Sequence, residues 1–133
     1  MTYKEHINKL CKKYKIKKYI RKRIAEQAFY DKRLIYIRPV NNIRNYVIAL
    51  HEIGHIVTRP NIGNFNIIKE EKNAWKWAKK NTVTWNSNAE KCKCESLESY
   101  YSWLQEIELI KKTINDLNKS LKDIYRKVKV KKK

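Results

Sequence analysis

The chain has 133 residues, of which 42% are hydrophobic and 34% charged, and these proportions exclude a disordered chain and predict one folded domain. Lysine and arginine number 32 against 13 aspartate and glutamate residues, so the formal net charge is +19. No stretch approaches the length of an apolar membrane span, and the first residues lack the apolar run of a signal peptide. Three cysteines, two of them separated by a single residue, do not predict a disulfide framework. We therefore expect a protein of the reducing cytoplasm, without a membrane partner.

The excess of positive charge has two interpretations. It favours association with polyanions, such as nucleic acid or an acidic protein surface. It also accompanies a chain dominated by Lys, Ile and Asn, a bias that an A+T-rich genome imposes whatever the function. Both interpretations stay open at this point.

Apolar periodicity predicts the first two elements. Apolar residues recur near the N-terminus at steps of four, three and four, which indicates one face of a helix. These residues are Tyr3, Ile7, Leu10 and Tyr14. Residues 29–38 are rich in aromatic and β-branched residues around the polar tripeptide 31–33, and they predict a β-hairpin that Pro39 closes.

Two helices are predicted in the middle of the chain. Asn41 and Asn42 are candidate N-caps for the first, and Arg59-Pro60 ends it. A polar loop at residues 61–64 leads to a second helix over Ile68–Lys80.

A long helical region is expected after Ser87, a candidate N-cap. Its last part has apolar residues at alternating steps of three and four over about three heptads. These residues are Ile107, Ile110, Ile114, Leu117, Leu121, Ile124 and Val128. The heptads predict either packing back on the first helix, whose stripe has matching spacing, or a dimeric coiled coil. The fold class is thus α+β and mainly helical: a single domain over residues 1–133, with a core of about 20–104 and a basic C-terminal helix and tail over 105–133.

The pentapeptide at residues 51–55 is the strongest chemical signal. His51 and His55 are four residues apart, so on a helix both imidazoles project from one face and can bind one Zn²⁺. Glu52 lies beside the first histidine, where it can take a proton from a zinc-bound water. Gly54 costs about 0.5–1 kcal/mol relative to Ala inside a helix, which suggests close approach of a neighbouring backbone.

A catalytic zinc site needs a third protein ligand and an open position. Glu70 and Glu71 begin the next predicted helix. We favour Glu71, because it shares a stripe with two small residues, Ala74 and Ala78, that allow that helix to lie close to the His51 helix.

The pentapeptide, followed by the segment 71–78 (Glu-x-x-Ala-x-x-aromatic-Ala), resembles the ImmA/IrrE family of metallopeptidases. The resemblance covers roughly residues 20–104. It implies a minimal zincin-like domain, in which a hairpin packs on the HExxH helix, with zinc ligands at His51, His55 and Glu71 and with Glu52 as general base. Trp77 stands where the family more often has Phe, and the Leu-Leu-Met-Pro-like segment that often follows is missing.

The resemblance also implies a function. Family members cleave transcriptional regulators in bacteria and mobile elements, so we expect a stand-alone, phage-like zinc endopeptidase that cleaves an intracellular repressor or regulator. The alternative is a non-proteolytic basic binding or inhibitory protein that uses the same fold against nucleic acid or an acidic protein.

Three further features have structural interpretations. Cys92 continues an apolar stripe, which predicts burial. The tryptophans at apolar helix positions are predicted to pack in the core, and the isolated His6 is expected at the surface.

Overall fold

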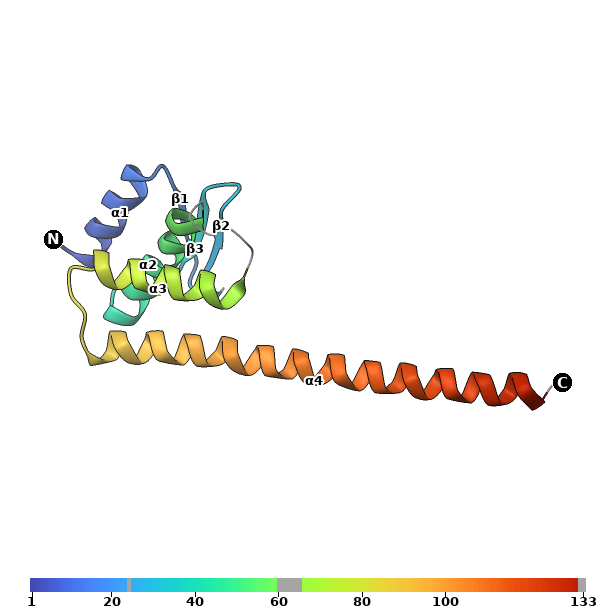
Figure 1. Ribbon diagram of the computed structural model, residues 1–133. Helices are drawn as coiled ribbons and strands as arrows, with labels where there is room; N and C mark the ends of the chain where they lie inside the picture. The colour runs from blue at the N-terminus through green and yellow to red at the C-terminus, as the bar shows by residue number, and fades with distance from the viewer. Residues whose placement is uncertain (24, 60–65, 132–133) are drawn as a thin grey trace. The chain divides into compact units, whose positions relative to one another are not determined.

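The computed structural model describes residues 1–23, 25–59 and 66–131. The chain forms a mainly helical α+β fold with a small sheet and a long C-terminal helix, which confirms the predicted fold class (Figure 1). Contacts within the chain divide it into two compact units: unit 1, Met1–Leu97, and unit 2, Glu98–Lys133. The elements in chain order are α1 (Tyr3–Lys13), β1 (Lys17–Ile20), β2 (Gln27–Phe29), β3 (Leu34–Ile37), α2 (Ile43–Thr58), α3 (Ile67–Asn81) and α4 (Ser87–Lys131).

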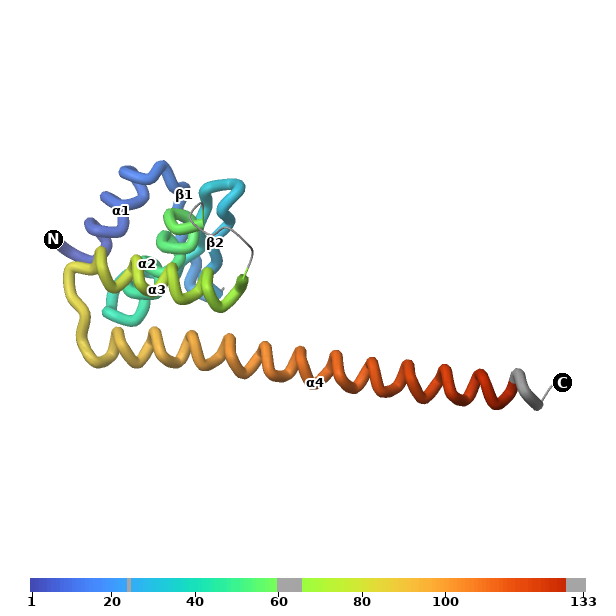
Figure 2. The backbone as a smooth tube through the Cα atoms, in the orientation of Figure 1, coloured from blue at the N-terminus to red at the C-terminus, as the bar shows by residue number. Residues whose placement is uncertain are grey.

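Helix α1 is confirmed, and both of its ends are capped by the chain itself. Thr2 and Glu5 form a capping box, in which the Thr2 hydroxyl accepts from the Glu5 backbone N–H. After the helix, Lys15 adopts a left-handed conformation with φ 55°, and the Ile16 N–H donates to the Cys11 carbonyl at 2.8 Å. This C-terminal motif turns the chain directly into β1, as the tube in Figure 2 shows.

The three strands form one sheet in the order β1-β3-β2. The predicted hairpin is confirmed, because β2 pairs antiparallel with β3 and Phe29 lies opposite Leu34. Strand β1 pairs parallel with β3 on the other edge, with Lys17 opposite Leu34, and the sequence did not predict it. Ile35 and Ile37 of β3 are fully buried, so the central strand turns one face toward the helices.

Helix α2 is the centre of unit 1. It contacts α1, α3, β2 and β3, and it is buried nearly all round, including Tyr46, Val47, Leu50 and Ile53. The Asn42 side chain accepts from the Asn45 backbone N–H at 2.8 Å, which confirms that residue as the N-cap. The predicted loop at residues 61–64 lies outside the described residues.

The start of α4 belongs to unit 1. The predicted N-cap at Ser87 is wrong: Asn86 caps this helix, because its side-chain oxygen accepts from the Ala89 backbone N–H at 3.0 Å while Ser87 is already helical. Ala89 and Cys92 then join the hydrophobic core, which confirms the predicted burial of the cysteine.

The burial of two other side chains, His6 and Trp75, can be compared with the prediction. The expectation for His6 is wrong, because this residue is half-buried with its Nδ1 2.6 Å from the Tyr46 hydroxyl oxygen. Tyr46 is fully buried and its hydroxyl also accepts from the Val83 backbone N–H at 3.0 Å. Trp75 is buried, as predicted for a core tryptophan.

Unit 2 consists of the α4 segment from Glu98 onward, and most of the apolar side chains described in it are exposed. The exposed fraction is 58% for Leu117 and 61% for Leu121. No helix in the described part of the chain is long and apolar enough to cross a membrane.

Candidate metal centre

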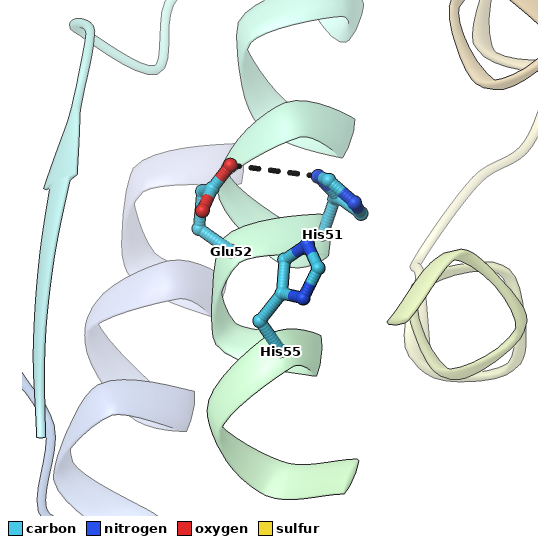
Figure 3. A group of neighbouring side chains, drawn as sticks. All are labelled: His51, Glu52 and His55. Atoms are coloured by element: carbon cyan, nitrogen blue, oxygen red, sulfur yellow. Dashed lines mark ion pairs between the residues drawn. The ribbon is translucent and has the colours of Figure 1, made fainter. Parts of the chain in front are cut away.

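The two histidines of the pentapeptide lie one turn apart on α2, as their spacing predicted. Figure 3 shows both rings on the same side of the helix, and their centroids are 4.4 Å apart in an edge-to-face arrangement. The His51 side chain is 7% exposed and that of His55 is 14% exposed, so His55 is the more accessible of the pair. Two imidazoles held in this way can both contact one ion or one polar group.

Glu71 of α3 is the group that both imidazoles face. Its Oε2 lies 2.7 Å from His51 Nε2, and its Oε1 lies 2.9 Å from His55 Nε2. One carboxylate therefore spans the two Nε2 atoms, and it is itself only 4% exposed. Two nitrogens and a carboxylate converge here from two helices.

Glu70, the alternative third ligand, lies elsewhere. Its Oε1 is 3.6 Å from Nδ1 of His55, and it accepts a hydrogen bond from Arg59 at 3.0 Å. Because an arginine neutralises this carboxylate and only one histidine is near it, Glu70 is the poorer candidate for a ligand.

Close packing of α2 on α3 brings Glu71 to the histidines. A Cβ placed on Gly54 would lie 2.6 Å from the backbone oxygen of Ala74, a distance that real Cβ atoms do not reach. Ala74 and Ala78 are fully buried, and Ala74 is the residue of α3 that meets the glycine on α2. The close approach predicted from Gly54 is confirmed, and it fixes the separation of the two helices at the site.

Glu52 is buried beside His51, and its carboxylate lies on the other edge of that ring. The distance from Glu52 Oε1 to His51 Nδ1 is 3.5 Å, drawn as the dashed line in Figure 3. His51, Glu52 and His55 each have a ligand atom within 4.8 Å of the others, so this trio is a second metal-binding geometry. The set His51, His55 and Glu71 differs from this trio in placing a carboxylate against Nε2 of both histidines.

Burial and charge set the protonation states of this cluster. Burial alone would lower the pKa of His51, but the carboxylates of Glu52 and Glu71 outweigh it and raise that pKa to about 9. Burial alone would raise the pKa of Glu71, but His51 and His55 outweigh it and lower that pKa to about 2. Near neutral pH the metal-free cluster therefore carries an imidazolium and a carboxylate, and a divalent cation must displace a proton to bind.

Trp75, which the sequence predicted only as a core residue, also contacts a candidate ligand, His51. Its ring stacks on His51 with centroids 4.2 Å apart and an interplanar angle of 14°, and its Nε1 donates to Ser96 Oγ at 3.3 Å. The only signal in the sequence was its position one helical turn after Glu71. Trp75 fixes the plane of the His51 ring.

The residues fit a zinc ion. Two imidazoles and one carboxylate are a donor set of catalytic zinc sites, which leave a fourth position for water. All three groups are buried or nearly so, and they meet in one place. No known protein family, curated protein or solved structure matches the chain.

Proposed function

We propose that the chain is a zinc-dependent endopeptidase. The observation that carries the proposal is the convergence of two Nε2 atoms, from His51 and His55, on the single carboxylate of Glu71 at 2.7 and 2.9 Å. Burying His51 and Glu71 costs free energy that apolar residues of the same size would not. A functional ligand for the cluster explains why the core of unit 1 contains it.

The residues of the chain divide the chemistry between them. His51, His55 and Glu71 would hold the zinc, which would supply Lewis acidity and activate water as a nucleophile. Glu52 would be the carboxylate that accepts a proton and passes it to the leaving amine. Its carboxylate now faces Nδ1 of His51, so this role requires its side chain to rotate toward the Nε2 edge. Substrate enters from the side of His55, the more exposed histidine.

The resemblance to the ImmA/IrrE family supports the choice of substrate. The proposal is that the chain cleaves a regulatory protein, such as a repressor, in the cytoplasm of a bacterial host. This step depends on the motif at residues 51–55 and on the Glu71–Ala78 segment. The structure contributes the placement of Glu71 against both histidines.

The experiment that tests the proposal compares wild type with Glu52→Gln. Both proteins, loaded with zinc, are incubated with a mixed peptide library, and cleaved bonds are identified by mass spectrometry. Glutamine keeps an oxygen that can accept from the His51 ring but cannot take a proton. We expect the variant to keep its zinc and to lose about 10²–10⁴-fold in cleavage rate.

Two outcomes contradict the proposal. Equal cleavage by both proteins would give Glu52 only the role of positioning His51. Failure of zinc-loaded wild type to cleave any library peptide, or a set of repressor-like proteins added in its place, would sink the endopeptidase function.

A specific feature favours a second function, polyanion binding. A pocket of about 480 Å³ on α3 and the start of α4 is lined by lysines and one leucine. Its lining residues are Lys72, Lys76, Lys79, Lys80, Lys93 and Leu97. Glu90 is the acid that pairs with two of them, Lys79 at 3.4 Å and Lys93 at 3.3 Å. The five lysines give the lining of the pocket a positive charge, which favours the phosphates of a nucleic acid.

Charge reversal tests this second function. The double variant Lys76→Glu and Lys80→Glu is compared with Lys119→Glu and Lys122→Glu, which makes the same charge change in unit 2. Fluorescence anisotropy of a labelled single-stranded RNA is measured over a salt series. We expect the pocket variant to weaken binding more than about tenfold and the control to weaken it less. Equal losses would mean that only the net charge matters, and tighter binding of a poly-glutamate peptide than of RNA would replace nucleic acid by an acidic protein.

A further inference from the structure

The C-terminal helix carries a stripe of apolar side chains that are exposed to solvent, whereas such side chains are usually buried. Within unit 2, apolar residues at alternating steps of three and four are exposed to between 47% and 61%. These residues are Ile110, Ile114, Leu117, Leu121, Ile124 and Val128. A continuous stripe of this kind marks an interaction surface, because scattered apolar residues would not recur at a heptad period.

Helix α1 is not a free partner for this stripe. Its apolar face, with Ile7 0% and Leu10 7% exposed, is buried in the core of unit 1, where α1 contacts α2. The apolar face of α1, which the sequence offered as a partner for the heptads, is therefore already covered by the core of unit 1. The stripe of unit 2 needs a different cover.

Charge is distributed unevenly along the same helix. Residues 98–115 hold three acids and two lysines, a net charge of −1, whereas residues 116–131 hold six basic residues and two acids, a net charge of +4. Two copies aligned in parallel would place one +4 half beside the other. Two antiparallel copies place the −1 half of each beside the +4 half of its partner, which is electrostatically favourable.

We propose that two copies of the chain pair through residues 103–128 as an antiparallel coiled coil. Centred between Ile114 and Leu117, this register stacks apolar residues in every layer. The layers pair Ile114 with Leu117, Ile110 with Leu121, Ile107 with Ile124, and Trp103 with Val128 of the other copy. The partner is a second copy of this chain, and the inference is independent of the peptidase function.

The residues that flank the stripe fit the same register. In an antiparallel pair, the residues that directly precede the first apolar residue of each heptad (the a position) face one another. This places Glu106 beside Lys127 of the other copy, twice per dimer. On the opposite flank Leu104 meets Tyr125, an apolar pair. A parallel pair would instead place Glu106 beside Lys111, so the identity of the partner of Glu106 distinguishes the two arrangements.

A charge swap tests the proposal on the full chain. Sedimentation equilibrium at low salt is run on wild type, on Glu106→Lys, on Lys127→Glu and on the double variant. Wild type is expected to be a dimer, each single variant to dissociate about tenfold more readily, and the double variant to recover wild-type affinity. These surface changes leave the core of unit 1 untouched, and a circular dichroism melt checks that each variant is folded.

Every other result overturns the proposal. A monomer at about 100 µM would mean that the stripe is covered within its own chain or by another protein. A dimer that the double variant does not restore, but that Glu106→Lys with Lys111→Glu does, is a parallel coiled coil. Trimers or larger species would exclude the two-copy arrangement. Leu117→Lys, which places a charge in the central layer, must also abolish the dimer.

Discussion

The two units of the chain depart in opposite ways from the usual rule that apolar side chains are buried and polar ones exposed. In unit 1, one histidine and two glutamates are buried among apolar side chains and a second histidine is largely buried, and in unit 2 a row of Ile, Leu and Val is exposed among charged ones. Each departure costs free energy unless something compensates for it. The two units therefore support the two proposals made above: a bound cation at the polar cluster, and the apolar helix of a second copy along the exposed stripe.

The largest expected effect is a loss of zinc affinity when a residue of unit 1 is changed. Glu71→Gln removes the charge that spans both Nε2 atoms, so we expect zinc affinity to fall by more than about 100-fold. Glu70→Gln, one residue earlier on the same helix, is the matched control and should cost less than about tenfold. Competition with a chromogenic zinc chelator measures both constants.

The assignment of the third ligand depends on that pair of variants. If Glu70→Gln weakens zinc as much as Glu71→Gln does, the carboxylate that spans the histidines is not the ligand. The association state of unit 2 should be the same in both variants, because their changes lie only in unit 1.

An intermediate effect is expected at the contact between α2 and α3. Gly54→Ala adds a Cβ 2.6 Å from the Ala74 backbone oxygen, which cannot retreat without moving α3. Overpacking costs about 1–3 kcal/mol, against a gain of about 0.5–1 kcal/mol from the better helix former, so the variant should be less stable. Urea unfolding of the metal-free protein measures the difference.

The control for this variant is Lys76→Ala, at an exposed position of α3, which should change stability by less than about 0.5 kcal/mol. A Gly54→Ala protein as stable as wild type, with unaltered zinc affinity, would show that the close helix contact does not set the geometry of the site.

The smallest effect is a pH dependence of the metal-free protein. His51 has a pKa raised from 6.5 to about 9 in the folded state, so its contribution to stability is complete below pH 6.5 and is lost as the pH rises through about 9. With a chelator present, the melting temperature of wild type minus that of His51→Ala should therefore fall over this range. A difference that stays constant or grows would mean that His51 is neutral in the folded protein at pH 7.

Local signals in the sequence predicted much of unit 1. The Asn42 cap, the hairpin and the spacing of His51 and His55 follow from residues close together in the chain. Gly54 and Ala74 predicted the helix contact because small residues allow two helix backbones to approach closely.

What the sequence did not predict depends on distant partners. Strand β1 is half lysine and pairs in parallel with β3, so neither its composition nor its neighbour marks it as a strand. Likewise, the stack of Trp75 on His51 and the position of Glu52 at the Nδ1 edge are set by tertiary packing. Asn86 replaced Ser87 as a cap because both types cap helices well and only the geometry distinguishes them.

The most direct test of the metal centre is the zinc content of the purified chain. Wild type and His51→Ala are prepared with zinc supplied and without chelators, and the metal is measured by inductively coupled plasma mass spectrometry. We predict about one zinc per wild-type chain and almost none in the variant. A wild-type chain without zinc, or equal zinc in both proteins, would contradict a site built from His51, His55 and Glu71.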